Sequence, residues 1–108
     1  MNDLRQVHRY AMELVEMADL NMPDVERIRR IAMYLEVMAA EELRGEYDAE
    51  PSRSVLYRSA ASLAYQCREF EQAAELIKVG LNGNPPAEIR AELEELRGQI
   101  LKAMEGYQ

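Results

Sequence analysis

The sequence contains one histidine and one cysteine, His8 and Cys67, the side chains best suited to acid–base or nucleophilic chemistry. They could act as a base and a nucleophile only if the fold brought them together. A second catalytic arrangement would need the carboxylates of Glu36 and Glu41 to converge with His8 in a pocket. Neither set forms a recognisable motif, so we expect no catalytic residues and a protein that is not an enzyme. Cys67 is expected to be a small core residue at a helix end.

The same scarcity argues against metals and cofactors. A single cysteine cannot build a multi-cysteine metal site, and a single histidine cannot supply the two Glu-x-x-His pairs of a di-iron helical bundle. The five glycines are scattered, and they form no phosphate-binding loop. We therefore expect neither a metal nor another cofactor.

Glu36 is the most informative carboxylate, because it interrupts the otherwise apolar run from Ile31 to Ala40. An unpaired buried carboxylate costs several kcal/mol, so Glu36 should be paired, neutral or exposed. A structural ion pair with Arg53 or Arg58 is the favoured interpretation. A polar anchor inside a binding groove and simple solvent exposure are the alternatives.

Composition and charge limit the classes of function. The chain has 108 residues, of which 48% are hydrophobic, enough for a folded core. Its net charge is −7, and residues 1–50 hold 6 Lys+Arg against 12 Asp+Glu. This charge disfavours binding to a phosphate backbone, so a nucleic-acid-associated regulator is the alternative rather than the main prediction. No apolar run is long enough to cross a membrane and no signal peptide is evident, so a cytoplasmic protein without membrane partners is expected.

The spacing of apolar residues predicts an all-α protein of five helices in one domain, residues 1–108. Apolar stripes with helical period indicate helices over about 3–20, 23–44, 51–67, 70–81 and 86–105. Residues 1–50 form an N-terminal helical pair, 51–86 a helical hairpin, and 87–108 a C-terminal capping helix. The hairpin should be antiparallel, since a very short turn joins its helices. Its small residues Ala60, Ala61, Ala73 and Gly80 should let the two helices approach closely.

Residues 52–86 resemble a tetratricopeptide repeat (TPR), a helix–turn–helix unit of about 34 residues. The most specific part is Phe70-Glu-Gln-Ala-Ala-Glu-Leu-Ile. The characteristic positions of the family fall on Tyr57, Ala60, Ala61, Phe70, Ala73, Ile77, Gly80 and Pro85. The sequence departs from the pattern at Ala60, where Leu is usual, at Ala64, where Tyr is usual, and at Arg68, which replaces a common Gly. Residues 50–61 also resemble small bacterial TPR-like proteins whose activity is not known.

The resemblance implies a non-catalytic protein–protein interaction module, a small adaptor or chaperone-like binder. In TPR proteins the first helix of each repeat lines the ligand groove. Carried onto this chain, those positions are Val55, Arg58, Ser59, Ser62, Tyr65 and Gln66. The lysine and asparagine clamp with which some TPR proteins hold acidic chaperone tails is absent, which argues against that ligand class. The partner that the resemblance implies is a protein or a peptide.

The first half of the chain has more apolar surface than one helical pair can bury. Six of the seven methionines fall within residues 1–38, and the run from Ile31 to Ala40 is apolar on nearly every face. Such residues are either core filler or an adaptable interface. Core filler is the favoured interpretation, and a homodimer that self-associates through Met12, Met17, Met33, Tyr34 and Val37 is the alternative.

Overall fold

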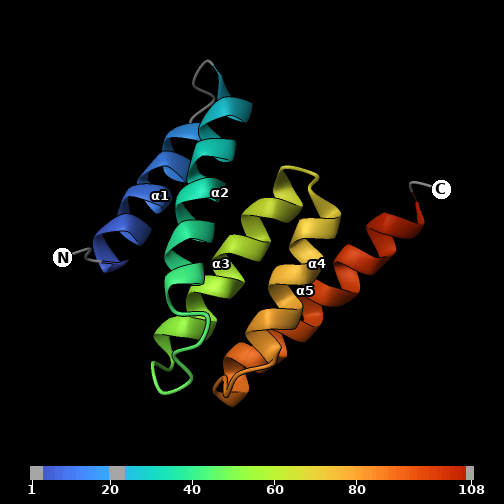
Figure 1. Cartoon of the computed structure of the whole chain (residues 1–108). Helices are drawn as coiled ribbons and strands as arrows, with labels where there is room; N and C mark the ends of the chain where they lie inside the picture. Colours follow the sequence, from blue (N-terminus) through green and yellow to red (C-terminus); the bar gives the residue numbers. More distant parts are fainter. Residues whose placement is uncertain (1–3, 20–23, 107–108) are drawn as a thin grey trace.

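The computed structural model describes residues 4–19 and 24–106, except for the side chains of residues 17–19. This part of the chain is all-α and has five helices: α1 (Leu4–Asp19), α2 (Val25–Glu42), α3 (Ser52–Gln66), α4 (Phe70–Leu81) and α5 (Ala87–Glu105) (Figure 1). The predicted fold class is confirmed. None of these helices is long and apolar enough to cross a membrane.

Each helix packs against the next one along the chain, and α3 also contacts α5. The short connections make successive helices antiparallel, so α1, α3 and α5 run in the same direction (Figure 1). The result is a flat array with extents of 40 × 40 × 19 Å. Odd-numbered helices can therefore share one face, and this face carries the grooves described below.

The turn between α3 and α4 is closed by a left-handed residue. Arg68 has φ 61°, and the amide of Glu69 donates a 2.8 Å hydrogen bond to the carbonyl of Ala64. Glycine usually occupies such a position, because a side chain there costs about 1–2 kcal/mol. Arg68 thus adopts the geometry of the glycine that it replaces in the repeat pattern.

The helices begin within two residues of the expected positions, and α2 and α5 begin without a side-chain cap. Asp24 precedes α2 with φ 64° and makes no capping hydrogen bond through its side chain, and Pro23 lies outside the described residues. The residue before α5 is Pro86, and the preceding Pro85 is buried. Proline offers no side-chain oxygen, so α5 begins without a side-chain cap.

Helices α3 and α4 form the second hairpin of the chain, which depends on the close approach of these two helices. Ala60, Ala61 and Ala73 are fully buried, and Gly80 is buried beside Tyr57. A Cβ added at Gly80 would lie 3.0 Å from the Cβ of Tyr57, which is too short for an ordinary contact. The predicted need for small residues at these positions is confirmed.

Helix α2 lies between α1 and α3, which explains most of its apolar character. It buries Ala32, Met33, Glu36, Ala39 and Ala40. The prediction that Met33 takes part in self-association is therefore wrong, because its side chain is only 1% exposed and belongs to the core.

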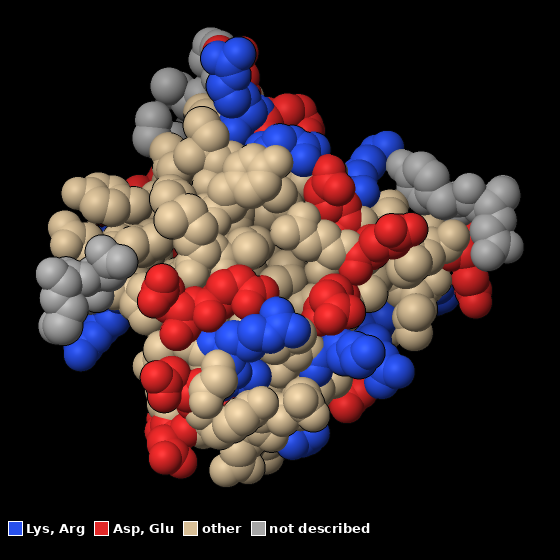
Figure 2. All heavy atoms as spheres, in the orientation of Figure 1, with Lys and Arg blue, Asp and Glu red and all other residues tan. Residues whose placement is uncertain are grey.

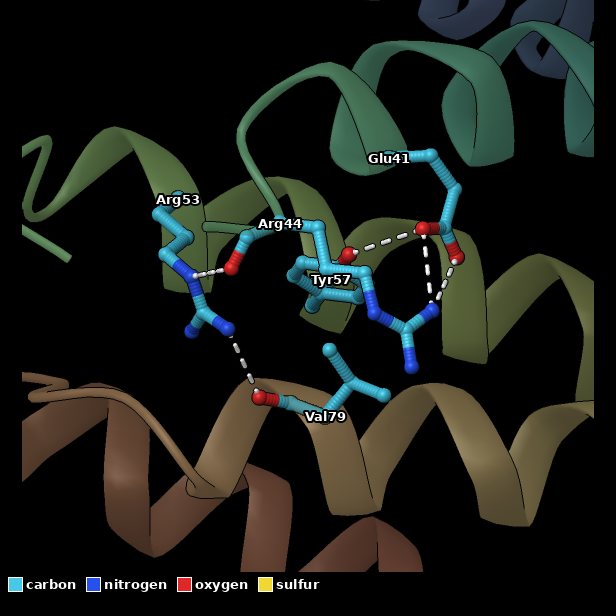
Figure 3. A network of polar contacts seen from close by, with 5 residues as sticks. All are labelled: Glu41, Arg44, Arg53, Tyr57 and Val79. Carbon is cyan, nitrogen blue, oxygen red and sulfur yellow. Dashed lines mark hydrogen bonds and ion pairs between the residues drawn. The ribbon is translucent and has the colours of Figure 1, made fainter. Parts of the chain in front are cut away.

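A buried arginine of α3 joins the segment after α2 to the end of α4. Arg53 Nε donates a 3.0 Å hydrogen bond to the carbonyl of Arg44, and Nη2 donates one of 3.1 Å to the carbonyl of Val79 (Figure 3). Its guanidinium also lies 4.9 Å and 5.2 Å from the ring centroids of Tyr47 and Tyr57. These contacts offset the cost of burying a cation.

A second set of polar contacts lies beside this arginine. Glu41 accepts hydrogen bonds of 3.1 Å from Arg44 and 3.4 Å from the hydroxyl of Tyr57 (Figure 3). Burial and the nearby Glu41 carboxylate raise the pKa of Tyr57 to about 12, so its hydroxyl stays protonated. The end of α2 is thereby joined to the middle of α3.

Replacing Arg53 with methionine should destabilise the fold. The change preserves much of the apolar stem but leaves the carbonyls of Arg44 and Val79 without their donor, at a cost of about 3 kcal/mol. Urea denaturation followed by circular dichroism would measure this loss. Arg97→Met, at an exposed position on α5, is the matched control and should change stability by less than about 0.5 kcal/mol. Equal effects of the two substitutions would contradict the structural role of Arg53.

Candidate functional site

A groove is lined by residues of α3 and α5 together with two residues of α1. This α3–α5 groove has a volume of about 410 Å³. It is lined by Met12 and Val15 from α1, Arg58, Ser59, Ser62, Leu63 and Gln66 from α3, and Glu92, Glu95, Leu96 and Gln99 from α5. Four of the six residues predicted on α3 thus line one surface.

Arg58 is already engaged across this groove. Its Nη1 donates a 2.9 Å hydrogen bond to Oε1 of Glu92, an ion pair between partly exposed side chains. Such a pair contributes little to stability, but it joins α3 to α5 and holds the guanidinium in one place. Arg58 therefore lines the groove with its guanidinium held in place by Glu92, where a ligand can contact it.

The other two predicted groove residues lie elsewhere. Tyr65 packs against Phe70, with ring centroids 5.7 Å apart and planes tilted by 54°, and it does not line the α3–α5 groove. Val55 lines a second groove, which we call the α1–α3 groove. The six predicted positions therefore divide among three environments.

The α1–α3 groove is larger, about 1090 Å³. It is lined by Leu4, Arg5, His8, Arg9 and Met12 from α1, Leu43 and Ala49 from the segment after α2, and Ser52, Val55 and Leu56 from α3. Met12 lines both grooves, so they adjoin on the face formed by α1, α3 and α5. Met12, predicted to mediate self-association, lies at their junction.

His8 connects the α1–α3 groove to the buried Glu36. Nδ1 of His8 and Oε1 of Glu36 share a 2.7 Å hydrogen bond. The Glu36 side chain is 0% exposed, and its second oxygen, Oε2, has no hydrogen-bond partner in the described part of the chain. Burial raises the pKa of Glu36 above the usual 4.5, and the proximity of His8 opposes this shift.

The predicted partners of Glu36 are therefore wrong. Arg53 is directed to backbone carbonyls at the end of α4, and Arg58 pairs with Glu92. Solvent exposure is also wrong, since the side chain is fully buried. Glu36 lines neither groove, so its influence on a ligand would pass through His8.

The structure gives little support to a catalytic site built from His8, Glu36 and Glu41 or to Cys67 as a nucleophile. His8 and Glu36 do meet, but Glu41 is bound to Arg44 and Tyr57, so the three residues do not form one site. Burial raises the pKa of the Cys67 thiol, which disfavours the nucleophilic thiolate. Cys67 is buried directly after α3, as expected of a core residue. Residues 4–19 and 24–106 contain no cluster of three or more His, Cys, Asp or Glu side chains that could hold a metal ion.

Sequence reasoning missed the part of the groove supplied by α5. The helix contributes Glu92 and Glu95, which no sequence motif singles out. They border the groove with Leu96 and Gln99, and these four positions follow the spacing of one helical face. That spacing could have shown that the four residues share one face of α5. Only the packing of α5 against α3 shows that this face is turned toward the groove.

No protein-family model, curated protein or solved structure matches this chain. The resemblance to TPR proteins thus rests on the residues of the repeat pattern alone. The groove must be interpreted from its own shape and chemistry.

The raised pKa of Glu36 predicts a pH dependence of stability. The folded state holds the Glu36 proton to higher pH than the unfolded chain does, so this contribution is fully present below pH 4.5 and is lost as pH rises through the raised pKa. Glu36→Gln should remove this slope from the free energy of unfolding. Urea denaturation at a series of pH values would measure it, with Glu42→Gln, at an exposed position on α2, as control. Parallel profiles for all three proteins would contradict the assignment.

Proposed function

We propose that this protein is a non-catalytic interaction module, an adaptor or chaperone-like binder, that holds a peptide segment of its partner in the α3–α5 groove. The observation that carries the proposal is that Arg58, Ser59, Ser62 and Gln66, expected from the repeat pattern, line one groove. The TPR-like character of the hairpin is part of the same proposal.

The chemistry of the groove suits a peptide. Met12, Val15, Leu63 and Leu96 give it apolar contacts, which can receive an apolar side chain. Ser59, Ser62, Gln66 and Gln99 supply hydroxyl and amide groups, which can donate to and accept from a peptide backbone. Glu92 and Glu95 disfavour a phosphate backbone at the same place, so the groove supports a peptide better than a nucleic acid.

Site-specific photo-crosslinking tests the proposal. A benzoylphenylalanine at Ser62 should form an adduct with a partner protein, whereas the same group at the exposed Arg27 on α2 should not. Adding Ser59→Arg, which places a bulky side chain in the groove, should abolish the Ser62 adduct, with circular dichroism confirming that the helices are intact. Adducts of equal yield at both positions, or an adduct that survives Ser59→Arg, would refute the proposal.

A second candidate function, self-association, is favoured by one observation. Ile31, Tyr34 and Met38 follow the spacing of one helical face and are 45%, 53% and 65% exposed. Figure 2 shows an area free of charged side chains over α1 and α2. Of the residues predicted for a dimer, Tyr34 lies on this stripe, Val37 is half-buried beside it, and the side chain of Met17 lies outside the described ones.

We expect the chain to dimerise through this stripe. Tyr34→Glu would place a charge within it and should shift sedimentation velocity toward the monomer. Leu101→Glu, at a similarly exposed apolar position on α5, is the matched control and should leave the distribution unchanged. A monomeric parent protein at high micromolar concentration would end the dimer hypothesis.

A further inference from the structure

A fully buried carboxylate on α2 has its hydrogen-bond partner on α1. Glu36 is 0% exposed, and its Oε1 shares a 2.7 Å hydrogen bond with Nδ1 of His8. Its other oxygen, Oε2, is buried and has no partner in the described part of the chain. Burying an ionised carboxylate with an unpartnered oxygen is costly, whereas a protonated carboxyl group is neutral. The packing of α1 on α2 therefore favours a proton on this pair.

The surroundings of the pair contain no other carboxylate that could hold this proton. Of the charged groups in the described part of the chain, only His8 acts on the pKa of Glu36, which burial raises. His8 lies in the α1–α3 groove with two exposed arginines of the same helix, Arg5 and Arg9. The groove residues from α3 and from the segment after α2 are uncharged: Leu43, Ala49, Ser52, Val55 and Leu56. The proton thus belongs to the His8–Glu36 pair.

Helix α1 is the element that this proton can control. Its extensive helix contacts are with α2 alone, so its departure leaves the packing of α3 with α4 and α5 in place. Helix α1 has 16 residues, and a helix of this length is only marginally stable by itself in water. Release of α1 from α2 would therefore expose its amide groups to solvent while the second hairpin stays folded.

We propose that the His8–Glu36 pair makes α1 a pH-sensitive lid over the α1–α3 groove. The protonated pair holds α1 on α2, and loss of the proton favours the release of α1, which removes one wall of the groove. In the released state water solvates Glu36, so its ionisation no longer carries the cost of burial. The lid operates whether or not a peptide binds in the α3–α5 groove.

The direction of the response follows from proton linkage. The closed state holds the proton of Glu36 to higher pH than the released state, in which the carboxyl group regains its usual pKa of 4.5. The contribution of the proton to closure is therefore fully present below pH 4.5 and is lost as pH rises through the raised pKa. A difference of one bound proton changes the opening equilibrium constant by at most about tenfold per pH unit.

Amide hydrogen exchange of the full chain, followed by nuclear magnetic resonance, tests the lid. Exchange is measured from mildly acidic to mildly alkaline pH and corrected for the intrinsic rate of each amide. The opening constant of α1 should exceed that of the most protected amides of α4 and should rise by up to about tenfold per pH unit while Glu36 ionises. The opening constant of α1 in Glu36→Gln should not depend on pH. Glu42→Gln, at an exposed position on α2, is the matched control and should keep the parent profile.

Three results would overturn the lid. Equal opening constants for α1 and for the most protected amides of α4 would mean that α1 leaves only when the whole chain unfolds. A pH-independent opening of α1 in the parent protein, or a slope that survives Glu36→Gln, would exclude the carboxyl group as its control.

A second variant tests the part of His8 and does not depend on the folding of Glu36→Gln. His8→Leu removes the donor that an ionised Glu36 needs, so it should raise the opening constant of α1 more at alkaline than at acidic pH. An equal rise at every pH would mean that His8 only packs against α2, and it too would overturn the proposal.

Discussion

The arrangement of the second hairpin depends on one buried cation. Arg53 is only 1% exposed, so its guanidinium must find acceptors inside the protein. It finds them at the end of α4 and in the segment after α2, parts of the chain 26 and 9 residues away. The hydrogen bonds fix where α4 ends relative to the start of α3. Because α5 follows α4 after a short connection, the same contacts help to determine the direction in which α5 crosses α3, and hence the shape of the α3–α5 groove.

The glycine after α4 belongs to this arrangement. A Cβ at Gly83 would clash with Nη1 of Arg53 and approach Oε2 of Glu50 at 3.3 Å. Glu50 in turn accepts hydrogen bonds from the amide and hydroxyl of Ser54, 3.1 and 2.7 Å long. The segment after α4 is therefore packed directly on the start of α3, and the absence of a side chain at residue 83 is a condition for burying the arginine.

The helices were predictable because their apolar spacing is regular. The close contact in the second hairpin was predictable because Ala73 and Gly80 are small. Periodicity does not tell which stripe of an apolar helix a neighbour covers. Met33 and Tyr34 are adjacent in sequence, yet one is in the core and the other is half exposed. The partner of Glu36 could not be predicted from the sequence either, since His8 lies 28 residues away and contacts Glu36 only because α1 packs on α2. For the same reason the sequence indicated the α3 wall of the groove but not the α5 wall.

Helix α1 differs from the other four in how it is anchored. It packs against α2 and makes at most marginal contact with any other helix, although its side chains form one wall of the α1–α3 groove. Separating α1 from α3 would therefore expose little core and leave the second hairpin intact. Since the opposite wall belongs to α3 within that hairpin, a shift of α1 would change the width of the α1–α3 groove, whereas in the α3–α5 groove it would displace only Met12 and Val15 and leave the α3 and α5 walls in place.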